Sequence, residues 1–412
     1  MLILARTLDV GGTERQIAML APGLVAAGFA VTVLLIGKRG ALAGALAAEG
    51  VEIVGPPLVS DARIAASRLA RSAALGLGSL RALAELLLRP PAVVHFFLPH
   101  AYIAGGLAAR LARPPVRVMS RRSQNDYQAK HPRLSRIEHR LHRDMTAIIA
   151  NSRRVARELV DEGADRERLR IIYNGVDLAR FAAPFDALAA RARLAIPAGA
   201  LVMVTLANLI AYKGHADLIA ALGRIRDSLP PIWRLLVVGR DDGIGEALKE
   251  AATREGIGER ILWLGLRDDV PDLLRLADIG ILASHEEGFS NAVLESMAAG
   301  LAMVVTDVGG NREAVGAGEA SGETARLPGP EAAEAGLLVP PRAPHLLAEA
   351  ILTLTRDRER MRAMGVRARE RAGSLFSRQA MIDAHVALYE ALIEGDAPPG
   401  EPPAGEDGSC AA

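Results

Sequence analysis

Short apolar runs alternate with longer segments of helical periodicity along most of the chain. The runs are short, bounded by turn residues and rich in Leu, Val and Ile, which predicts buried strands. The segments between them, such as Glu14–Ala27 and Ala101–Ala112, place apolar residues at three- and four-residue spacing and predict helices. The predicted strands are Met1–Ala5, Ala30–Ile36, Ala92–Phe97, Val116–Met119, Ala147–Ile149, Leu169–Ile172, Leu201–Leu206, Trp233–Val238, Ile261–Leu264, Ile279–Ala283 and Met303–Thr306. This alternation predicts an α/β protein with parallel sheets covered by helices on both faces.

The strands fall into two series, separated by a segment without a long apolar run. This segment, Phe181–Ala200, carries Pro184, Pro197 and Gly199 and is typical of a linker. A chain of 412 residues is also long enough for two hydrophobic cores. We therefore expect two doubly wound domains, 1–185 and 186–375, followed by a helix at 376–393 and a disordered, Gly-, Pro- and acid-rich tail at 394–412.

Composition excludes several classes of protein. Apolar residues make up 50% and charged residues 24%, which is the balance of a globular protein. A single Cys excludes a disulfide framework within the chain and a Cys-based zinc site. Residues 17–37 are apolar, but Pro22, Gly23 and Gly28 interrupt them, which favours a helix, a turn and a strand over a membrane span. The start of the chain predicts a short strand rather than a signal peptide, so we expect a cytoplasmic protein.

Positive charge is concentrated in the first half of the chain. Residues 1–185 carry 26 Lys and Arg against 15 Asp and Glu, and the remaining residues carry 23 against 33. Such a half is typical of a protein with an anionic partner, although a solvated basic face is an equal alternative. Aromatic residues at 3% are too few for platforms that stack single-stranded nucleic acid, so we expect no nucleic-acid partner.

The most specific segment is Ser284–Glu295, which follows a predicted strand and opens a helix near Asn291. Gly288 permits a tight turn before this helix. The N–H groups of the helix start, from Phe289, Ser290, Asn291 and Ala292, are expected to bind an anion such as a pyrophosphate. Glu287 and Glu295 flank this site, and because like charges repel, they are better suited to sugar hydroxyls than to the phosphate. A capped helix with solvated acids is the alternative, which spacing alone does not exclude.

This segment resembles the E-x7-E signature of retaining glycosyltransferases of the GT-B fold, family 4. Further segments resemble motifs of that family in the same order, and the resemblance covers about residues 1–393. It implies two Rossmann-like domains facing a deep cleft, with a nucleotide sugar held mainly by the second domain and an acceptor mainly by the first. It also implies that the final helix crosses back to the first domain. The further segments are Asp9–Gln16, Ile148–Arg153, Ile171–Asp177, Ala207–His215 and Thr306–Glu313.

The resemblance also implies roles for individual residues of the second domain. Glu295 would bind the ribose hydroxyls of the nucleotide, Glu287 the hydroxyls of the transferred sugar, and Lys213 the diphosphate. Where the family's phosphate loop usually has an Arg, this chain has Asn208, and Arg240 is a candidate to replace the missing charge. The predicted donor-binding residues are Asn208, Lys213, Gly214, Arg240, Arg267, Glu287, Gly288, Phe289, Ser290, Asn291, Ala292 and Glu295.

In the first domain, the Gly11-Gly12 loop and His100 each follow a predicted strand. Glycines there let the backbone approach the acceptor or the diphosphate, although a tight turn alone is the alternative. His100 is the candidate to contact the transferred sugar near the reacting carbon, whereas His95 lies within a strand and is expected to be buried. Several arginines are candidates for contact with lipid headgroups or an anionic acceptor, or for a solvated face: Arg121, Arg122, Arg133, Arg136, Arg140 and Arg143.

Together these observations predict a retaining, metal-independent glycosyltransferase with His100, Glu287 and Lys213 as catalytic residues. The expected co-substrate is a UDP- or GDP-sugar with no further cofactor, and the acceptor is a glycan, a lipid-linked or a small molecule. Peripheral contact with the inner membrane face through the basic domain is also expected. A sugar-nucleotide epimerase of related form and a non-catalytic binding subunit are the alternatives. The stretch Gly316–Ala335 is interpreted as a surface insertion, and the nine His show no metal-ligand spacing.

Overall fold

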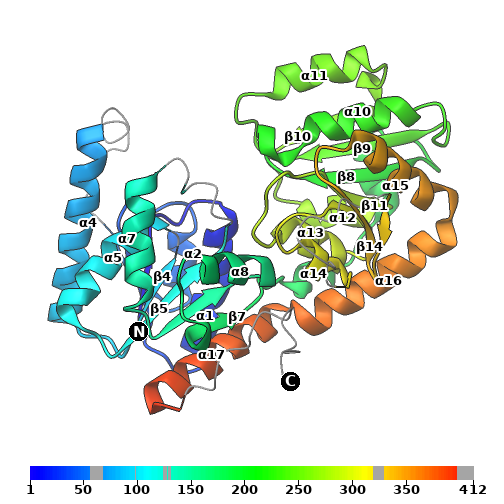
Figure 1. Cartoon of the computed structure of the whole chain (residues 1–412). Helices are drawn as coiled ribbons and strands as arrows, with labels where there is room; N and C mark the ends of the chain where they lie inside the picture. Colours follow the sequence, from blue (N-terminus) through cyan, green and yellow to red (C-terminus); the bar gives the residue numbers. More distant parts are fainter. Residues whose placement is uncertain (56–67, 98, 124–127, 129–130, 319–328, 397–412) are drawn as a thin grey trace, which may run out of the picture. The chain divides into compact units, whose positions relative to one another are not determined.

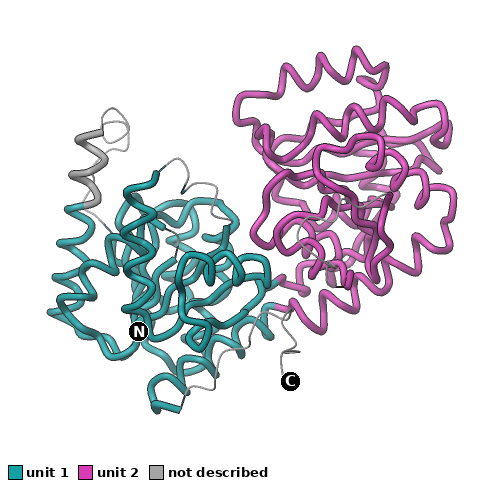
Figure 2. The backbone as a smooth tube through the Cα atoms, viewed as in Figure 1, with its two compact units in different colours: residues 1–175, 378–412 teal, residues 176–377 magenta. Residues whose placement is uncertain are grey.

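The computed structural model describes residues 1–55, 68–97, 99–123, 128, 131–318 and 329–396. It divides into two compact units (Figures 1 and 2). Unit 1 comprises Met1–Gly175 and the chain from Arg378 onward, and unit 2 comprises Val176–Ser377. Each unit is a doubly wound α/β domain, which confirms the predicted fold class. The cleft expected between the domains stays a prediction.

The sheet of unit 1 has seven parallel strands in the order β3-β2-β1-β4-β5-β6-β7. The sequence predicted six of these strands and missed β3, which is three residues long, lies at the sheet edge and is partly exposed. The strands are β1 Leu2–Ala5, β2 Thr32–Leu35, β3 Glu52–Val54, β4 Val93–Phe97, β5 Val116–Arg121, β6 Ala147–Ala150 and β7 Leu169–Ile171. The helices are α1 Gly12–Ala26, α2 Ala43–Ala48, α4 Arg68–Leu88, α5 Pro99–Ala112, α7 Pro132–His142, α8 Arg153–Asp161, the 3-10 turn η1 Arg166–Arg168 and α17 Arg378–Glu394.

Helices cover both faces of this sheet, because alternate strand residues point to opposite sides. In β1, Ile3 packs with α1, α2 and α17, whereas Leu4 packs with α4, α5, α7 and α8. Gly23 of α1 lies where any side chain would collide with Ile382, so α1 and α17 approach closely. The last helix of the chain is therefore part of the core of unit 1.

A cluster of buried polar side chains links α17 to the sheet through hydrogen bonds. His95 of β4 is fully buried, as expected, and its two ring nitrogens lie 2.6 Å from the Tyr389 hydroxyl and 2.7 Å from that of Ser120. His385, one turn before Tyr389, bonds the Met381 carbonyl through Nδ1. Burial and the charge of Arg122 lower the pKa of His385 to about 3, and burial lowers that of His95, so both rings are neutral at pH 7.

The sheet of unit 2 has the order β10-β9-β8-β11-β12-β14-β13, with only the β13–β14 pair antiparallel. The five predicted strands are confirmed, whereas the short edge strand β13 and its neighbour β14 were missed. The strands are β8 Leu201–Leu206, β9 Trp233–Val238, β10 Ile261–Gly265, β11 Ile279–Leu282, β12 Ala302–Thr306, β13 Glu331–Ala332 and β14 Gly336–Val339. The helices and 3-10 turns are η2 Leu178–Phe181, α9 Ala187–Arg193, η3 Ala211–Lys213, α10 His215–Ile225, α11 Gly245–Arg254, η4 Gly258–Arg260, α12 Val270–Leu276, α13 Asn291–Ala298, α14 Asn311–Val315, α15 Pro344–Arg356 and α16 Arg358–Leu375.

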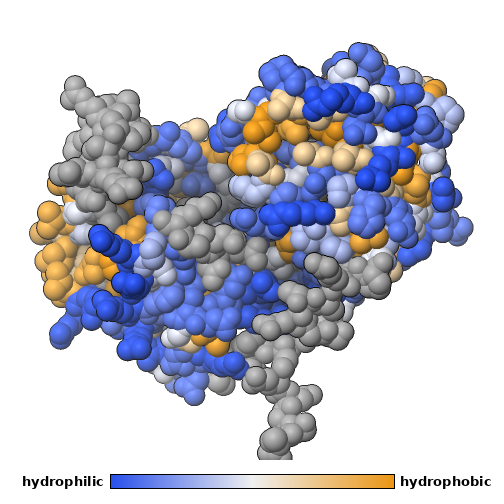
Figure 3. Space-filling model, turned by 45° about the horizontal axis from the view of Figure 1, so that its top comes forward, coloured by the Kyte–Doolittle hydropathy of each residue, from blue (hydrophilic) through white to orange (hydrophobic). Residues whose placement is uncertain are grey.

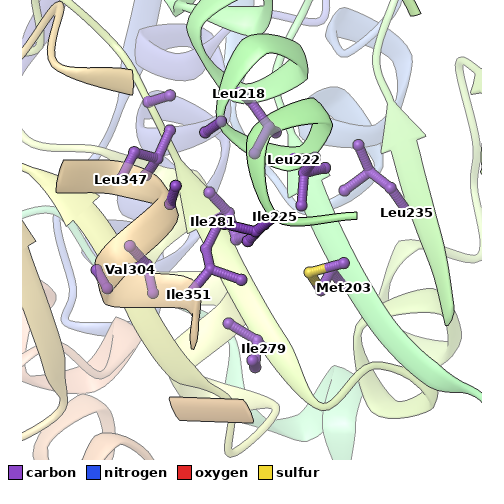
Figure 4. Packing of buried hydrophobic residues seen from close by; sticks show 14 of the residues in the cluster. Met203, Leu218, Leu222, Ile225, Leu235, Ile279, Ile281, Val304, Leu347 and Ile351 are labelled. Carbon is purple, nitrogen blue, oxygen red and sulfur yellow. The ribbon is translucent and has the colours of Figure 1, made fainter. Parts of the chain in front are cut away.

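The central strands of unit 2 are almost wholly apolar, as expected for strands buried on both faces. On one face, Met203 and Ile281 pack against Leu222 of α10 and Ile351 of α15 (Figure 4). This core holds the carboxyl ends of β8 and β11 in fixed register, and the loops that follow them carry the predicted donor site.

The boundary between the domains lies at Gly175/Val176, ahead of the predicted 185/186. Residues 176–185 belong to unit 2 because Arg275 of α12 donates to the Ala183 carbonyl (2.8 Å) and stacks 4.4 Å from the Phe185 ring. The predicted linker also contains α9, whose first N–H groups are capped by the Asp186 carboxylate. At its other end unit 2 extends to Ser377, so the final helix begins at Arg378 rather than residue 376.

A second buried network lies on the opposite face of the unit 1 sheet. Arg121, at the end of β5, forms two hydrogen bonds with Glu162 (2.8 and 3.0 Å) and one with Glu138 (2.6 Å). Burial alone would raise the pKa of Glu162, but hydrogen bonds from His142 and Arg121 outweigh it and lower the pKa to about 2. Arg121 is therefore a structural residue rather than a contact for lipid. Arg133, Arg136, Arg140 and Arg143 are exposed on and just after α7, and their partner stays a prediction.

The predicted tail at 394–412 lies outside the described residues from position 397, and so do residues 319–328 of the predicted insertion. Within the part of the chain that the structure describes, no helix combines the length and the apolar character that crossing a membrane requires.

Candidate functional site

Two loops at the carboxyl end of the unit 2 sheet bring Lys213 and Glu287 together. Lys213 ends η3 after β8, and Glu287 lies in the loop after β11. The Lys213 ammonium donates to Glu287 Oε1 at 2.6 Å, and the Ser284 hydroxyl donates to the same oxygen at 2.8 Å. Both side chains of the ion pair are largely buried. Residues 74 positions apart in the sequence thus form one fixed pair of opposite charges.

Two glycines with positive φ let these loops come into contact. Gly214 has φ 69°, and a side chain there would collide with the Ala283 carbonyl. Gly309, in the loop after β12, has φ 54°, and a side chain there would collide with the Glu287 carbonyl. Both positions need the left-handed conformation that only glycine adopts without strain. The backbone of the Glu287 loop is therefore clamped from both sides.

His285 and Asp217 add a further link between the same two loops. The His285 ring lies 2.8 Å from the Asp217 carboxylate on the first turn of α10, and the His285 N–H donates to the Tyr212 carbonyl at 2.7 Å. Neither residue is among the predicted donor-binding residues, and Ser284 was predicted only as the start of the motif segment. Ser284 and His285 lie three and two residues before Glu287, and Asp217 lies four residues after Lys213. This closeness in sequence was the available signal.

The helix α13 begins directly after this loop, as predicted. Ser290 is its N-cap, and the first turn of a helix carries a partial positive charge that favours an anion. Phe289 is buried and packs edge-on against Phe376, so this residue is part of the core and positions the helix start. Glu295 lies one turn into α13 and is buried. The two acids of the motif thus differ, since Glu287 is in a loop and Glu295 is on a helix.

Asn208, Arg240 and Arg267 lie around the other loops of unit 2. The Asn208 side-chain oxygen accepts the Arg240 backbone N–H (3.1 Å), which braces the loops after β8 and β9. The Arg240 guanidinium pairs with Asp242, and Arg267 pairs with Asp269 in the same way, each at 2.6 Å. Arg267 also lines a cavity of about 360 Å³ between α9 and α12. The proposed replacement of the missing phosphate cation by Arg240 stays a prediction.

In unit 1, Gly11 is the N-cap of α1 and Gly12 its first residue. A side chain at Gly11 would meet only the mobile end of the Glu14 side chain, so the structure sets no strict requirement for glycine there. His100 lies on the first turn of α5, after β4, and its side chain reaches the surface. Partial desolvation and the charges of Arg6 and His131 lower its pKa, which favours the neutral imidazole. The roles of these residues stay predictions.

The described residues contain no group of three or more His, Cys, Asp or Glu side chains placed to hold a metal ion. The pair Asp241-Asp242 lies in the loop between β9 and α11. Asp241 accepts the N–H groups of Gly243, Ile244 and Gly245 and so caps α11.

Two family models match the chain. One, glycosyltransferase family 4, matches residues 10–180, and the other, glycosyl transferases group 1, matches residues 200–357. The chain belongs to glycosyltransferase family 4. The resemblance seen in the sequence motifs is thereby confirmed, and the matched ranges fall in both units.

Several curated relatives of this family 4 member are named transferases. A D-inositol 3-phosphate glycosyltransferase of Kineococcus radiotolerans is 32% identical over 60% of this chain and 57% of its own length. A lipopolysaccharide core biosynthesis mannosyltransferase, LpsB of Rhizobium meliloti, is 29% identical over 61% and 67%. The chain spans about half the length of the inositol 3-phosphate relatives it matches.

Solved structures share the GT-B fold of this family 4 member over nearly its whole length. Anabaena HepE in complex with UDP aligns with a TM-score of 0.76 at 22% identity, over 95% of this chain and 99% of that one. Sucrose-phosphate synthase from Thermosynechococcus elongatus aligns with a TM-score of 0.75 at 20% identity, over 96% and 99%. These likenesses show the fold.

Proposed function

We propose that this protein transfers a sugar from a nucleoside-diphosphate sugar to a glycan, lipid-linked or small-molecule acceptor. The observation that carries the proposal is the Lys213–Glu287 pair, held at 2.6 Å beside the start of α13 at the carboxyl end of a doubly wound sheet. Ligands bind at that end in such folds. Family membership supports it, and so does the crystal structure of HepE in complex with UDP-glucose.

Each group of the site has a task in this reaction. Lys213 and the helix N-terminus stabilise the negative charge that develops on the leaving diphosphate, because both are positive and fixed before the donor arrives. Glu287, oriented by Ser284, accepts hydrogen bonds from hydroxyls of the transferred sugar. The buried carboxylate of Glu295 accepts hydrogen bonds from the hydroxyls of the nucleotide ribose. His100 contacts the sugar from unit 1.

The proposed stereochemistry rests on the family resemblance, and the proposed charge balance rests on the groups of the site. The transfer proceeds with retention, as the E-x7-E resemblance implies, and the leaving phosphate helps to remove the acceptor proton. Lys213 and α13 supply the positive charge, so the reaction needs no metal ion. It takes place in the cytoplasm, where nucleotide sugars are made.

Nucleotide binding tests this proposal directly. We expect one of UDP, GDP and ADP to raise the melting temperature, because a ligand at 100 times its Kd adds about 2.7 kcal/mol of stability. Lys213→Ala and Glu295→Ala should each abolish the shift. Lys249→Ala should keep it, because Lys249 is exposed and pairs only with Glu246 among the described residues.

If none of the three nucleotides stabilises the wild-type protein, the non-catalytic alternative replaces the proposal. If a nucleotide binds, turnover separates the remaining alternatives. A transferase releases nucleoside diphosphate from the nucleotide sugar, whereas an epimerase interconverts nucleotide sugars.

We also propose that unit 1 touches a membrane surface through an apolar stripe on α4. Leu77, Leu80, Leu87 and Leu88 recur at helical spacing and are between 62% and 80% exposed. Apolar residues gather over this part of the molecule at the left edge of Figure 3. Arg89, which follows the stripe, pairs with Glu52 and Glu85, so the proposed contact rests on the exposed leucines.

Sedimentation with vesicles of phosphatidylcholine and phosphatidylglycerol checks this contact. We expect the double variant Leu80→Ser/Leu87→Ser to bind the vesicles at least about tenfold more weakly, because each serine removes apolar area that would be buried in the lipid. Leu188→Ser, in unit 2, is the control, because Leu188 is more exposed than either substituted leucine. Equal binding of both variants to the vesicles would disprove the contact.

A further inference from the structure

Arg122 is a buried arginine near the carboxyl end of β5 in unit 1, and its surroundings differ from those of its neighbour Arg121. It is 9% exposed. Its Nη1 donates to the Asn174 side-chain oxygen at 2.7 Å, and its guanidinium carbon lies 5.1 Å from the centre of the Phe97 ring. The other two guanidinium nitrogens, Nε and Nη2, are buried and have no hydrogen-bond partner among the described residues.

These two nitrogens form one edge of the planar guanidinium. Their N–H bonds are nearly parallel, and this fork matches the two oxygens of a carboxylate or a phosphate group. Asn174 holds Nη1 and the Phe97 ring lies against the guanidinium, so the orientation of the free edge is fixed before any ligand binds. The protein thus presents a preorganised fork of two N–H donors.

No acid of the described chain offsets the charge of Arg122. Arg121, one residue earlier, is neutralised by Glu138 and Glu162, but no ion pair between Arg122 and a carboxylate is present among the described residues. The groups around Arg122 are His95, His385 and Tyr389, which are neutral at pH 7. The buried Nε2 of His385 also has no hydrogen-bond partner in the described part of the chain. Burial lowers the pKa of Arg122 to about 10, which leaves it charged.

A buried charge without a partner destabilises the protein, so binding of a compensating anion would be strongly favourable. Arg122 also follows the strand β5 at the sheet end where ligands of doubly wound domains bind. We propose that the Nε–Nη2 edge of Arg122 binds an oxyanion, a phosphate or a carboxylate, that is part of the acceptor. The proposal rests on the proposed function, since only a transferase has an acceptor. Because both nitrogens are shielded from solvent, neighbouring side chains must move when the anion enters.

Melting curves without nucleotide test this site. The full-length protein is titrated with inorganic phosphate, glycerol 3-phosphate and acetate at constant ionic strength. We expect one of the two acceptor-like probes, glycerol 3-phosphate or acetate, to stabilise the wild-type protein. Arg122→Met, which keeps the side-chain stem, should bind that probe at least tenfold more weakly. Arg117→Met is the matched control, because Arg117 lies on the same strand and donates only to backbone carbonyls in the described hydrogen bonds.

The three probes distinguish the sources of the anion. Stabilisation by glycerol 3-phosphate identifies a phosphorylated acceptor, and stabilisation by acetate an acidic one. Stabilisation by inorganic phosphate alone overturns the acceptor assignment in favour of a free ion. Unchanged affinities in Arg122→Met, or no stabilisation of the wild-type protein by any probe, overturn the site itself.

Two further measurements keep the test decisive. If Arg122→Met fails to fold, Arg122→Lys replaces it, since lysine keeps the charge but lacks the fork and should bind at least tenfold more weakly. Wild-type affinity in Arg122→Lys would overturn the role of the fork. The same variants are titrated with UDP, GDP and ADP. If none of these nucleotides shifts the melting of any variant, the proposed function fails, while the result with the anions remains valid.

Discussion

Replacing Lys213 with alanine is expected to lower kcat about 10²- to 10³-fold and also to weaken binding of the nucleotide sugar. The ammonium lies in a largely buried ion pair, so it interacts with developing charge at low dielectric, where one lost donor has an effect of this size. The change also leaves Glu287 without its counter-charge, which misorients the carboxylate that contacts the sugar. The measurement is the initial rate of nucleoside diphosphate release from the nucleotide sugar.

Two variants make this result specific. Lys249→Ala removes an exposed lysine of the same unit and should leave the rate unchanged. Glu287→Gln keeps the size of the side chain and the hydrogen bond from Ser284, and should lower kcat while the affinity for free nucleotide stays within about threefold. A Lys213→Ala enzyme with wild-type kcat would show that this residue has no part in stabilising the leaving group.

Replacing Arg121 with alanine is expected to lower the free energy of unfolding of unit 1 by about 3–5 kcal/mol. The guanidinium bonds both Glu138 and Glu162, and its removal leaves two buried carboxylates facing each other. Chemical denaturation followed by circular dichroism measures the loss. Arg89→Ala, which breaks an exposed pair with Glu52, should change the same quantity by less than about 1 kcal/mol.

The Arg121 network also predicts an acid transition. The pKa of Glu162 is about 2 in the folded protein, below the ordinary value of 4.5, so the folded state binds fewer protons than the unfolded state. Its contribution of about 3 kcal/mol is therefore complete above about pH 5 and is lost as the pH falls from about 4.5 towards 2. In Glu162→Gln this part of the acid dependence should disappear. A wild-type protein whose stability is flat between pH 5 and pH 3 would contradict the assignment.

The sequence predicted the central strands well, because their apolar runs directly reflect burial on two faces. The runs Leu201–Leu206 and Trp233–Val238 coincide with β8 and β9 at both ends. The short strands β3 and β13 lie at sheet edges, where partial exposure removes the apolar signal. The boundary at 175/176 was missed because contacts of Arg275 with Ala183 and Phe185, distant in sequence, draw the supposed linker into unit 2.

The contacts within the candidate site were not predicted from the sequence, and the roles of its residues stay predictions. The family resemblance pointed to Glu287 and Lys213, but it assigned them to different parts of the donor and did not predict that they pair with each other. Spacing also grouped Arg121 with Arg122 as one basic patch. The structure separates them, because successive residues of a strand point to opposite faces of the sheet. One arginine meets two acids and the other meets none among the described residues.

The last helix has a consequence for how the chain folds as it is made. Tyr389 and Met381 of α17 are buried in the core of unit 1, although they are synthesised after all of unit 2. The core of unit 1 therefore stays incomplete until all of unit 2 has been synthesised, and until then unit 1 exposes the apolar surface that α17 covers. Exposed apolar surface makes a partly folded chain prone to aggregation, so a chaperone would be needed most before α17 packs onto unit 1.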